Sequence, residues 1–345
     1  MKSKLFLFLY FFLLTSVSQA QIIAHYTIKK NSDCVGNYAL FVFPGIQIPA
    51  LSGKNINKLS MFHLHNKKWQ KIIFQIDQKD VQGRYLMNVG HLPVRNNFAT
   101  QDELVFRDKE LAERIDPFSS LNHTHSLIEL EVISDNGSRW IYIDIDSEHS
   151  EFALNDNDLL AYDPKQDIVS SSLFKLGFSK TQPFLLEQLQ WRSSNGTDWG
   201  RDITDTMKIR HQGKFMGFQF KRSQNDYDSQ LLAVKEGPLR IIRRTENRIK
   251  MFWKLKSPVL YIDYIISHNG FVMDSMIDIP FKIGYFFSEL ATITTMDWNN
   301  LEADSEFKIQ RSKYYPEIII NGKPSELKQH FNQLWGKQFS LAAQG

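Results

Sequence analysis

The sequence predicts an all-β protein built as a β-sandwich, either one large sandwich or two domains, with a short C-terminal helix. Short segments rich in β-branched and aromatic residues alternate with turn residues, which is typical of strands joined by tight turns. Four Asn-Gly pairs occur along the chain, at 136–137, 195–196, 269–270 and 321–322. Asn-Gly suits the positive φ angles of a two-residue hairpin turn. Hydrophobic residues make up 42% and charged residues 23% of the 345 residues, as in folded domains.

Two β-hairpins are the clearest elements. Segments 127–134 and 139–146 flank one Asn-Gly pair, and in both of them apolar and polar residues alternate. Such alternation predicts strands that each bury one face. The second hairpin is expected to join 259–266 to 271–279. Further strands are expected at 22–28, 38–43, 69–77, 103–106, 171–178, 215–221, 239–244, 251–255 and 317–320.

Helical periodicity is rare. One or two helical turns are expected over 109–115. The better candidate is 326–335, where Leu327, Phe331 and Leu334 fall at i, i+4 and i+7. Ser325 suits its N-cap and Gly336 the residue after its end, which predicts the C-terminal helix.

Residues 1–20 have the pattern of a secretory signal peptide. Two lysines precede an apolar run from Leu5 to Val17, and Ser18 and Ala20 are the small residues of a cleavage site. The alternative, a membrane anchor, is disfavoured because thirteen helical residues reach only about 20 Å across a ~30 Å hydrocarbon core. We therefore expect an N-terminal β-sandwich domain over 21–163 and a C-terminal β-rich domain over 164–345.

Composition narrows the compartment and the partners. The chain has a single cysteine, Cys34, so no intramolecular disulfide can form. An exported chain without disulfides suggests a bacterial periplasmic or secreted protein. The net charge is +3, or about +1 without the leader, which gives no reason to expect nucleic-acid binding. No later apolar stretch is long enough for a membrane span, so none is expected in the mature chain.

Acidic residues gather between positions 77 and 108, next to expected strand ends. If the strands 69–77 and 103–106 are neighbours, Asp77, Asp80, Asp102 and Asp108 could supply the oxygen ligands of a Ca²⁺ site. A pair drawn from Asp77, Asp80, Asp102 and Glu103 could instead act as catalytic acid and base. The third alternative is that these acids cap turns and are solvated. Ca²⁺ is the cofactor that this acidic cluster suggests, and otherwise we expect none.

Three short motifs carry a resemblance to a protein family. They are W-x-x-x-x-F-Q-I-D-x-x-D-x-x-G-x-Y from Trp69 to Tyr85, D-E-L-V-F from Asp102 to Phe106, and G-P-L-R-I-I-R-R from Gly237 to Arg244. In these short motifs the chain resembles a group of uncharacterised exported bacterial proteins with predicted β-sandwich folds, and the resemblance extends over about half of the mature chain. The resemblance implies the fold class and export, and no activity.

Two further sets of side chains are candidates for ligand binding. Arg240 and Arg244 fall on one face of their strand and could grip a carboxylate or an acidic sugar. The alternative is pairing with acids of a neighbouring strand. Trp140, Tyr142 and Asp144 lie opposite the isoleucines of their strand and could form a carbohydrate platform. The alternative is that this face packs against another layer.

Histidine pairs at 63/65 and 123/125 could each form half of a zinc site, although structural histidines are the simpler interpretation. Taken together, the sequence predicts an exported binding protein for a carbohydrate or cell-envelope glycan. The alternatives are a glycan-active enzyme with a carboxylate pair, or a structural partner of an envelope complex.

Overall fold

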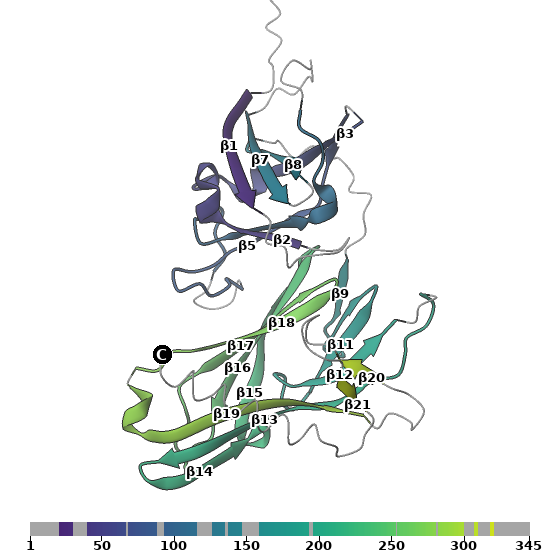
Figure 1. Ribbon diagram of the computed structural model, residues 1–345. Coiled ribbons are helices and arrows are strands. Elements are labelled where there is room, and N and C mark those ends of the chain that lie inside the picture. The colour runs from purple at the N-terminus through teal and green to yellow at the C-terminus, as the bar shows by residue number, and fades with distance from the viewer. Residues whose placement is uncertain are drawn as a thin grey trace, which may run out of the picture. The chain divides into compact units, whose positions relative to one another are not determined.

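The structure is a computed structural model of the chain. It describes residues 21–29, 40–66, 68–87, 93–115, 126–134, 137–146, 159–192, 196–252, 254–280, 282–299, 307–309 and 318–320. Strands dominate this part of the chain, and its only helices are short 3₁₀ turns, so the fold is all-β (Figure 1). The 3₁₀ turns are η1 (Gly45–Gln47), η2 (Pro49–Leu51), η3 (Ile56–Lys58), η4 (Asp108–Glu110), η5 (Gln224–Asp226) and η6 (Ile283–Tyr285).

The chain divides into two compact units that are discontinuous in sequence. Unit 1 contains residues 1–161, 232–244 and 263–273, and unit 2 contains 162–231, 245–262 and 274–345. The chain first passes from unit 1 to unit 2 between residues 161 and 162, close to the expected boundary at 163/164. However, the C-terminal half of the chain also contributes two segments to unit 1, which the expected division did not include.

Unit 1 is a β-sandwich of two sheets. The larger sheet has the order β1-β7-β8-β3-β4, with β1 (Gln21–Lys29), β7 (Ser126–Ser134), β8 (Gly137–Asp144), β3 (Ser60–His65) and β4 (Lys68–Lys71). The smaller has the order β2-β6-β5, with β2 (Leu40–Pro44), β6 (Glu103–Arg107) and β5 (Phe74–Asp77). Strands β1 and β7 are parallel, and the other pairs in these two sheets are antiparallel.

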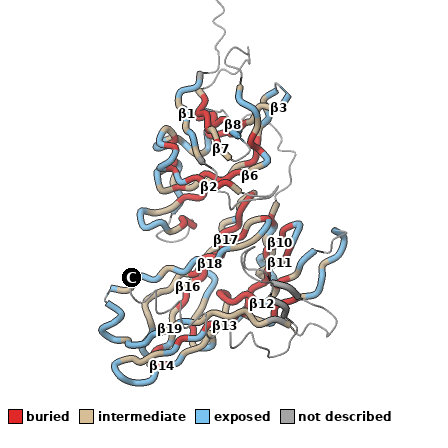
Figure 2. Tube along the Cα trace, viewed as in Figure 1, coloured by how far each residue is buried: buried red, intermediate tan, exposed pale blue. Residues whose placement is uncertain are grey.

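The core of unit 1 lies between its two sheets. Phe43 and Phe106 of the smaller sheet belong to one buried cluster with Ile128, Ile141 and Ile143 of the larger sheet. Figure 2 shows these strands as mostly buried. The isoleucines are those whose alternation predicted the first hairpin, and the burial of this face confirms that prediction.

Unit 2 contains three further sheets. Their orders are β12-β11-β10-β9, β14-β13-β19 and β20-β21. The strands are β9 (Leu160–Asp163), β10 (Ile168–Ser171), β11 (Phe174–Phe178), β12 (Leu186–Trp191), β13 (Thr204–Phe215), β14 (Phe218–Ser223), β19 (Phe287–Trp298), β20 (Phe307–Ile309) and β21 (Ile318–Ile320), the first two residues of β9 being assigned to unit 1.

A last sheet, β15-β16-β17-β18, has residues in both units. Its strands are β15 (Tyr227–Lys235), β16 (Arg240–Ile249), β17 (Leu260–Ser267) and β18 (Gly270–Ile277). The second expected hairpin corresponds to β17 and β18.

Several expected elements differ from the structure. The strand expected at 215–221 contains the turn between β13 and β14, and the one expected at 171–178 is divided between β10 and β11. The strand expected at 69–77 is two strands of different sheets, β4 and β5, because the chain leaves one sheet at the buried Ile72 and Ile73. The described residues of 251–255 do not form the expected strand, and the Met251 N–H donates to the Leu255 carbonyl at 2.8 Å. Only η4 is helical near 109–115, since Ala112 pairs through its backbone with Trp140.

Several predictions concern residues outside the described part of the chain. They are the leader 1–20, Cys34, the helix 326–335 and the pair His123 and His125. Among the described residues, no helix has the length and apolarity needed to cross a bilayer.

Candidate functional site

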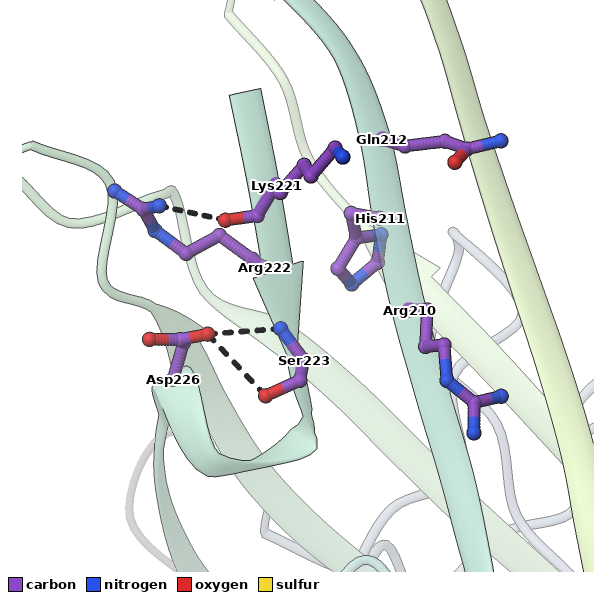
Figure 3. Close-up of a pocket in the computed structure, with 7 residues that line it drawn as sticks. All are labelled: Arg210, His211, Gln212, Lys221, Arg222, Ser223 and Asp226. Carbon is purple, nitrogen blue, oxygen red and sulfur yellow. Dashed lines mark hydrogen bonds between the residues drawn. The ribbon is translucent and has the colours of Figure 1, made fainter. Parts of the chain in front are cut away.

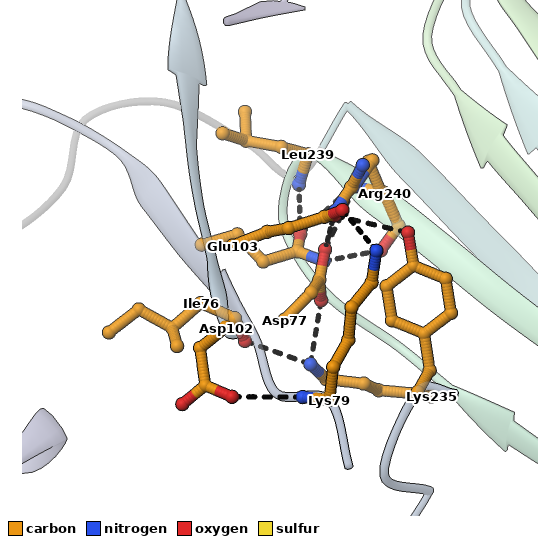
Figure 4. Close-up of polar contacts among 10 residues, drawn as sticks. Ile76, Asp77, Lys79, Asp102, Glu103, Lys235, Leu239 and Arg240 are labelled. Carbon is orange, nitrogen blue, oxygen red and sulfur yellow. Dashed lines mark hydrogen bonds and ion pairs between the residues drawn. The ribbon is translucent and has the colours of Figure 1, made fainter. Parts of the chain in front are cut away.

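The acidic cluster of unit 1 is centred on an ion pair rather than an open site (Figure 4). Asp77 and Glu103 are directly opposite each other on β5 and β6. The Arg240 guanidinium contacts both carboxylates, donating through Nε to Asp77 Oδ2 at 2.8 Å and through Nη2 to Glu103 Oε2 at 2.5 Å. Lys235 Nζ donates to Asp77 Oδ1 at 2.6 Å, and Lys79 pairs with Glu103. Both carboxylates are therefore neutralised by cations.

Gln75 connects this cluster to the chain before β16. Its Nε2 donates to Asp77 Oδ1 at 2.8 Å, and its Oε1 accepts from the Leu239 and Arg240 N–H groups at 3.0 and 2.9 Å. Burial alone would raise the pKa of Asp77, but Lys235, Arg240 and the Gln75 hydrogen bond outweigh burial and lower it. Asp77 is therefore ionised at neutral pH, and the cluster holds segment 235–240 on β5.

The other acids of the cluster point to separate places. Asp102 is buried and accepts hydrogen bonds from the Lys79 and Ala99 N–H groups and from Arg95. Asp80 pairs with Arg84 across its own turn. Asp80 and Asp102 therefore do not join Asp77 and Glu103 in one site, because each of them satisfies its own turn or a nearby cation.

No metal-ligand group is evident in the part of the chain that the structure describes. There, no three His, Cys, Asp or Glu residues are placed to hold a metal ion. His63 contacts the Glu110 carbonyl oxygen at 2.7 Å and Gln70 at 3.1 Å, so its ring has hydrogen-bonding partners without a metal.

Arg240 and Arg244 do not form an open grip for a ligand. Arg244 is fully buried and forms a two-point ion pair with Asp263, with Nε to Oδ1 at 2.7 Å and Nη2 to Oδ2 at 2.6 Å. Its Nη1 also donates to the Tyr85 carbonyl at 2.9 Å. The two buried arginines therefore do not form the expected grip. Arg244 pairs with an acid of the neighbouring strand β17, as the alternative expected, whereas Arg240 pairs with acids of the β2-β6-β5 sheet.

The expected aromatic platform on β8 is also corrected. Tyr142 and Asp144 are buried, and Trp140 is half-buried. The Tyr142 hydroxyl donates to Glu129 at 3.0 Å and accepts from the Ile115 N–H at 2.9 Å. Segment 110–115 thus covers this face through polar contacts, which the alternation of one strand could not reveal.

An open hollow of about 380 Å³ lies in unit 2, between β13 and β14 (Figure 3). Residues 210–212 of β13 pair in antiparallel register with 221–223 of β14. The lining residues are Arg210, His211, Gln212, Lys221, Arg222, Ser223 and, from η5, Asp226. We refer to this hollow as the β13–β14 pocket.

The β13–β14 pocket has an excess of positive charge. Arg210, Lys221 and Arg222 line it and pair with no carboxylate among the described residues, in contrast to the arginines of unit 1. Asp226, its one carboxylate, accepts from the Ser223 N–H at 2.8 Å and caps η5. With three cations and one acid, the lining carries a formal charge of 3 − 1 = +2.

Arg222 is held in place by its surroundings. Its Nε donates to the Lys250 carbonyl and its Nη1 to the Lys221 carbonyl, both at 2.6 Å. The guanidinium also lies 5.2 Å from the ring centres of Phe220 and Phe252. A cation fixed by carbonyls and aromatic rings loses little further freedom when it binds an anion.

His211 lies beside the pocket as a neutral, buried group. Its Nε2 is 2.6 Å from the Tyr227 hydroxyl and its Nδ1 is 2.8 Å from Thr292 Oγ1. Burial lowers the pKa of His211, so the imidazole is uncharged at neutral pH. Because both ring nitrogens have partners, His211 connects β13 to β15 and β19.

The sequence interpretation missed the β13–β14 pocket. The available signal was charged residues in two neighbouring strands, at Arg210, Lys221 and Arg222. The hairpin register, which no single strand encodes, sets Arg210 and Lys221 on one face of the two strands, whereas Arg222 lies opposite His211 and projects on the other face.

Comparisons of the chain with models of protein families, with curated proteins and with solved structures found no match.

Proposed function

We propose that this chain is an exported binding protein whose ligand is an acidic glycan of the cell envelope, held at the β13–β14 pocket. The observation that carries the proposal is that Arg210 and Lys221 lie on one face of the β13–β14 hairpin beside the hollow, with no carboxylate partner among the described residues, while Arg222 lines it from the other face. Guanidinium and ammonium groups bind carboxylate or sulfate groups through charge-assisted hydrogen bonds.

The polar residues of the pocket support a sugar ligand. Gln212 and Ser223 place an amide and a hydroxyl beside the cations, and such groups can exchange hydrogen bonds with sugar hydroxyls. A volume of about 380 Å³ falls within the ~300–1,000 Å³ of small-molecule pockets. The site suits a short anionic segment of a longer chain, because the hollow is open.

Binding is better supported than turnover. Of the candidate acids, Asp77 and Glu103 share Arg240 as a partner, and although burial alone would raise the pKa of Asp77, Lys235 and Arg240 hold it below its ordinary value. A general acid needs the opposite environment, one that raises its pKa. His211 has both ring nitrogens engaged, so no free base is positioned at the β13–β14 pocket.

The test is a titration of the purified protein with a polyuronate, a sulfated polysaccharide, a neutral glucan and a short DNA duplex, followed by calorimetry at low and moderate salt. We expect binding of the acidic glycans and little binding of the glucan. Arg210→Gln with Lys221→Gln should weaken binding at least tenfold, because two charge-assisted contacts are lost. Lys180→Gln is the matched control, since Lys180 is an exposed lysine of unit 2 that does not line the pocket.

Three outcomes would count against the proposal. The first is equal binding of the neutral glucan. The second is an equal loss of affinity in the Lys180→Gln control. The third is binding of the DNA as tight as that of the glycans, which would show that the pocket responds to charge alone.

A further inference from the structure

Three turns of unit 2 meet at one end and expose large apolar side chains. The first is the β13–β14 hairpin turn, where the Met216 N–H donates to the Phe286 carbonyl at 2.7 Å. Phe215, just before this turn, has its ring 5.2 Å from Phe252 and 5.0 Å from Phe287. The turn after Phe252 and the η6 segment before Phe287 therefore surround the same aromatic ring. Figure 1 shows η6 and the β13–β14 hairpin at the same end of unit 2.

The exposed side chains of these turns form a surface that we call the apolar tip. Met216 is 66% exposed, Phe218 72%, Leu255 55% and Tyr285 75%. Ile283 and Phe286 complete the set and are also exposed. Figure 2 shows the tips of these segments as exposed. Side chains of this size, gathered on one surface, mark a site of interaction with a protein or a membrane.

Met216 is exposed at a conformational cost. It has φ of 49° and Gly217 has φ of 86°, so the two residues form a hairpin turn with positive φ at both central positions. Asn, Asp or Gly is the usual first residue of such a turn, whereas an unbranched apolar residue is strained there. The chain therefore presents a methionine where a polar residue would fold more easily.

Positive charge accompanies the apolar tip. Each turn carries a lysine: Lys214 beside the hairpin, Lys254 beside Leu255, and Lys282 at the start of η6. Lys214 pairs with Glu289 at 2.9 Å. Lys254 and Lys282 are exposed, and neither pairs with an acid in the described part of the chain. Lysines that flank apolar side chains complement a surface of anionic lipid headgroups.

We propose that the apolar tip binds the surface of an anionic lipid bilayer, with Met216, Phe218, Leu255 and Tyr285 inserted at the headgroup boundary. The apolar groups come from the tips of separate turns rather than from a flat sheet face. Protruding tips fit a deformable bilayer, whereas a protein partner would need a matching cavity for each of them. Tyr285 suits this depth because its ring is apolar and its hydroxyl can stay in water.

The test is flotation of the purified protein with vesicles of phosphatidylcholine, with and without phosphatidylglycerol. All variants must share one N-terminus, confirmed by mass spectrometry, because the apolar run 5–17 would itself bind lipid. We expect binding that requires phosphatidylglycerol and weakens with salt. Met216→Asn with Phe218→Thr should reduce it at least tenfold, since two apolar side chains no longer leave water. Lys254→Gln with Lys282→Gln should reduce it about fivefold for each lysine.

Val81→Ser is the matched control, because Val81 is an exposed apolar turn residue of unit 1 and should not affect vesicle binding. The Met216→Asn change should leave the melting temperature equal or higher, so lost binding would not reflect unfolding. The proposal would be overturned if Met216→Asn with Phe218→Thr bound vesicles as well as the wild type does. It would also be overturned if Val81→Ser lost as much vesicle binding as that double variant. A third result would also overturn it: the protein does not bind vesicles but forms a dimer in light scattering, and Met216→Asn with Phe218→Thr disrupts that dimer. The apolar tip would then be an interface between two copies.

Discussion

Asp77 and Asp80 show how different two acids of one motif can be. Both belong to the F-Q-I-D-x-x-D segment, three residues apart. Asp77 is fully buried, and its ion pair with Arg240 joins residues 163 positions apart in the chain. Asp80 is more exposed and bonds only within its own turn, to the N–H groups of Gln82 and Arg84 and to the Arg84 side chain.

This contrast predicts different costs for the same substitution. Asp77→Asn should lower the free energy of unfolding by about 3–5 kcal/mol, because in a buried site it removes the carboxylate partner of Lys235 and leaves Arg240 with Glu103 alone. Asp80→Asn is the control and should cost less than about 1 kcal/mol, since its pair with Arg84 is near the surface. Urea denaturation of both variants measures the difference. Similar costs for the two substitutions would refute the structural role assigned to Asp77.

The same environments bear on Ca²⁺ binding. The carboxylates of Asp77, Asp102 and Glu103 already accept hydrogen bonds from cations. A divalent ion would have to displace them, so we expect the melting temperature to be the same in EDTA and in millimolar Ca²⁺. A rise with Ca²⁺ that Asp77→Asn abolishes would restore the calcium site, because ligand binding to the folded state stabilises it.

The loop between β15 and β16 depends on a glycine for close packing. A Cβ atom on Gly237 would lie 2.4 Å from Gln75 Oε1 and 2.5 Å from its Cδ. That oxygen is the acceptor for the Leu239 and Arg240 N–H groups, so it has little freedom to move. The glycine thus allows β16 to begin directly against β5.

Gly237→Ala should therefore destabilise the protein by about 1–3 kcal/mol, through overpacking and weakened hydrogen bonds to Gln75. Gly270→Ala is the matched control. Gly270 also lies in unit 1, has no atom within 4 Å of an added Cβ, and does not require a positive φ. We expect it to change stability by no more than about 0.5 kcal/mol in thermal or urea unfolding. Equal effects of the two changes would contradict the packing argument.

At the scale of the whole molecule, stability should depend on buried neutral histidines. His211 in unit 2 and His268 in unit 1 both have pKa values that burial lowers from the ordinary 6.5. In the unfolded chain these rings bind protons near pH 6.5, whereas in the folded chain they bind them only at lower pH. The unfolded state is therefore favoured as the pH falls below about 6.5.

We expect the free energy of unfolding to decrease from pH 7 to about pH 5, and His211→Gln to reduce this decrease. The Asp77 contribution has a separate window, because its lowered pKa stabilises the fold above about 3.8 and that stabilisation is lost only at more acidic pH. Urea unfolding at a series of pH values separates the two effects. A flat profile between pH 7 and 5 would contradict the histidine assignment.

The hairpins and the fold class follow from the sequence by itself. The alternation of Ile128, Leu130 and Val132 and the Asn-Gly pair at 136–137 are local signals, because strand geometry and turn geometry depend on neighbouring residues. The same local pattern could not show that 69–77 divides between two sheets, since both β4 and β5 have strand character.

Only the tertiary structure decided which polar residues are available to a ligand. Tyr142, Arg240 and Arg244 are polar or charged residues on strands, and the strand pattern could not decide between ligand binding and coverage by other segments, which the structure shows. Arg210 and Lys221 are ordinary charged strand residues until the hairpin register sets them around one hollow. The physical reason is that burial and ion pairing arise between segments far apart in the chain, whereas strand periodicity is a property of consecutive residues.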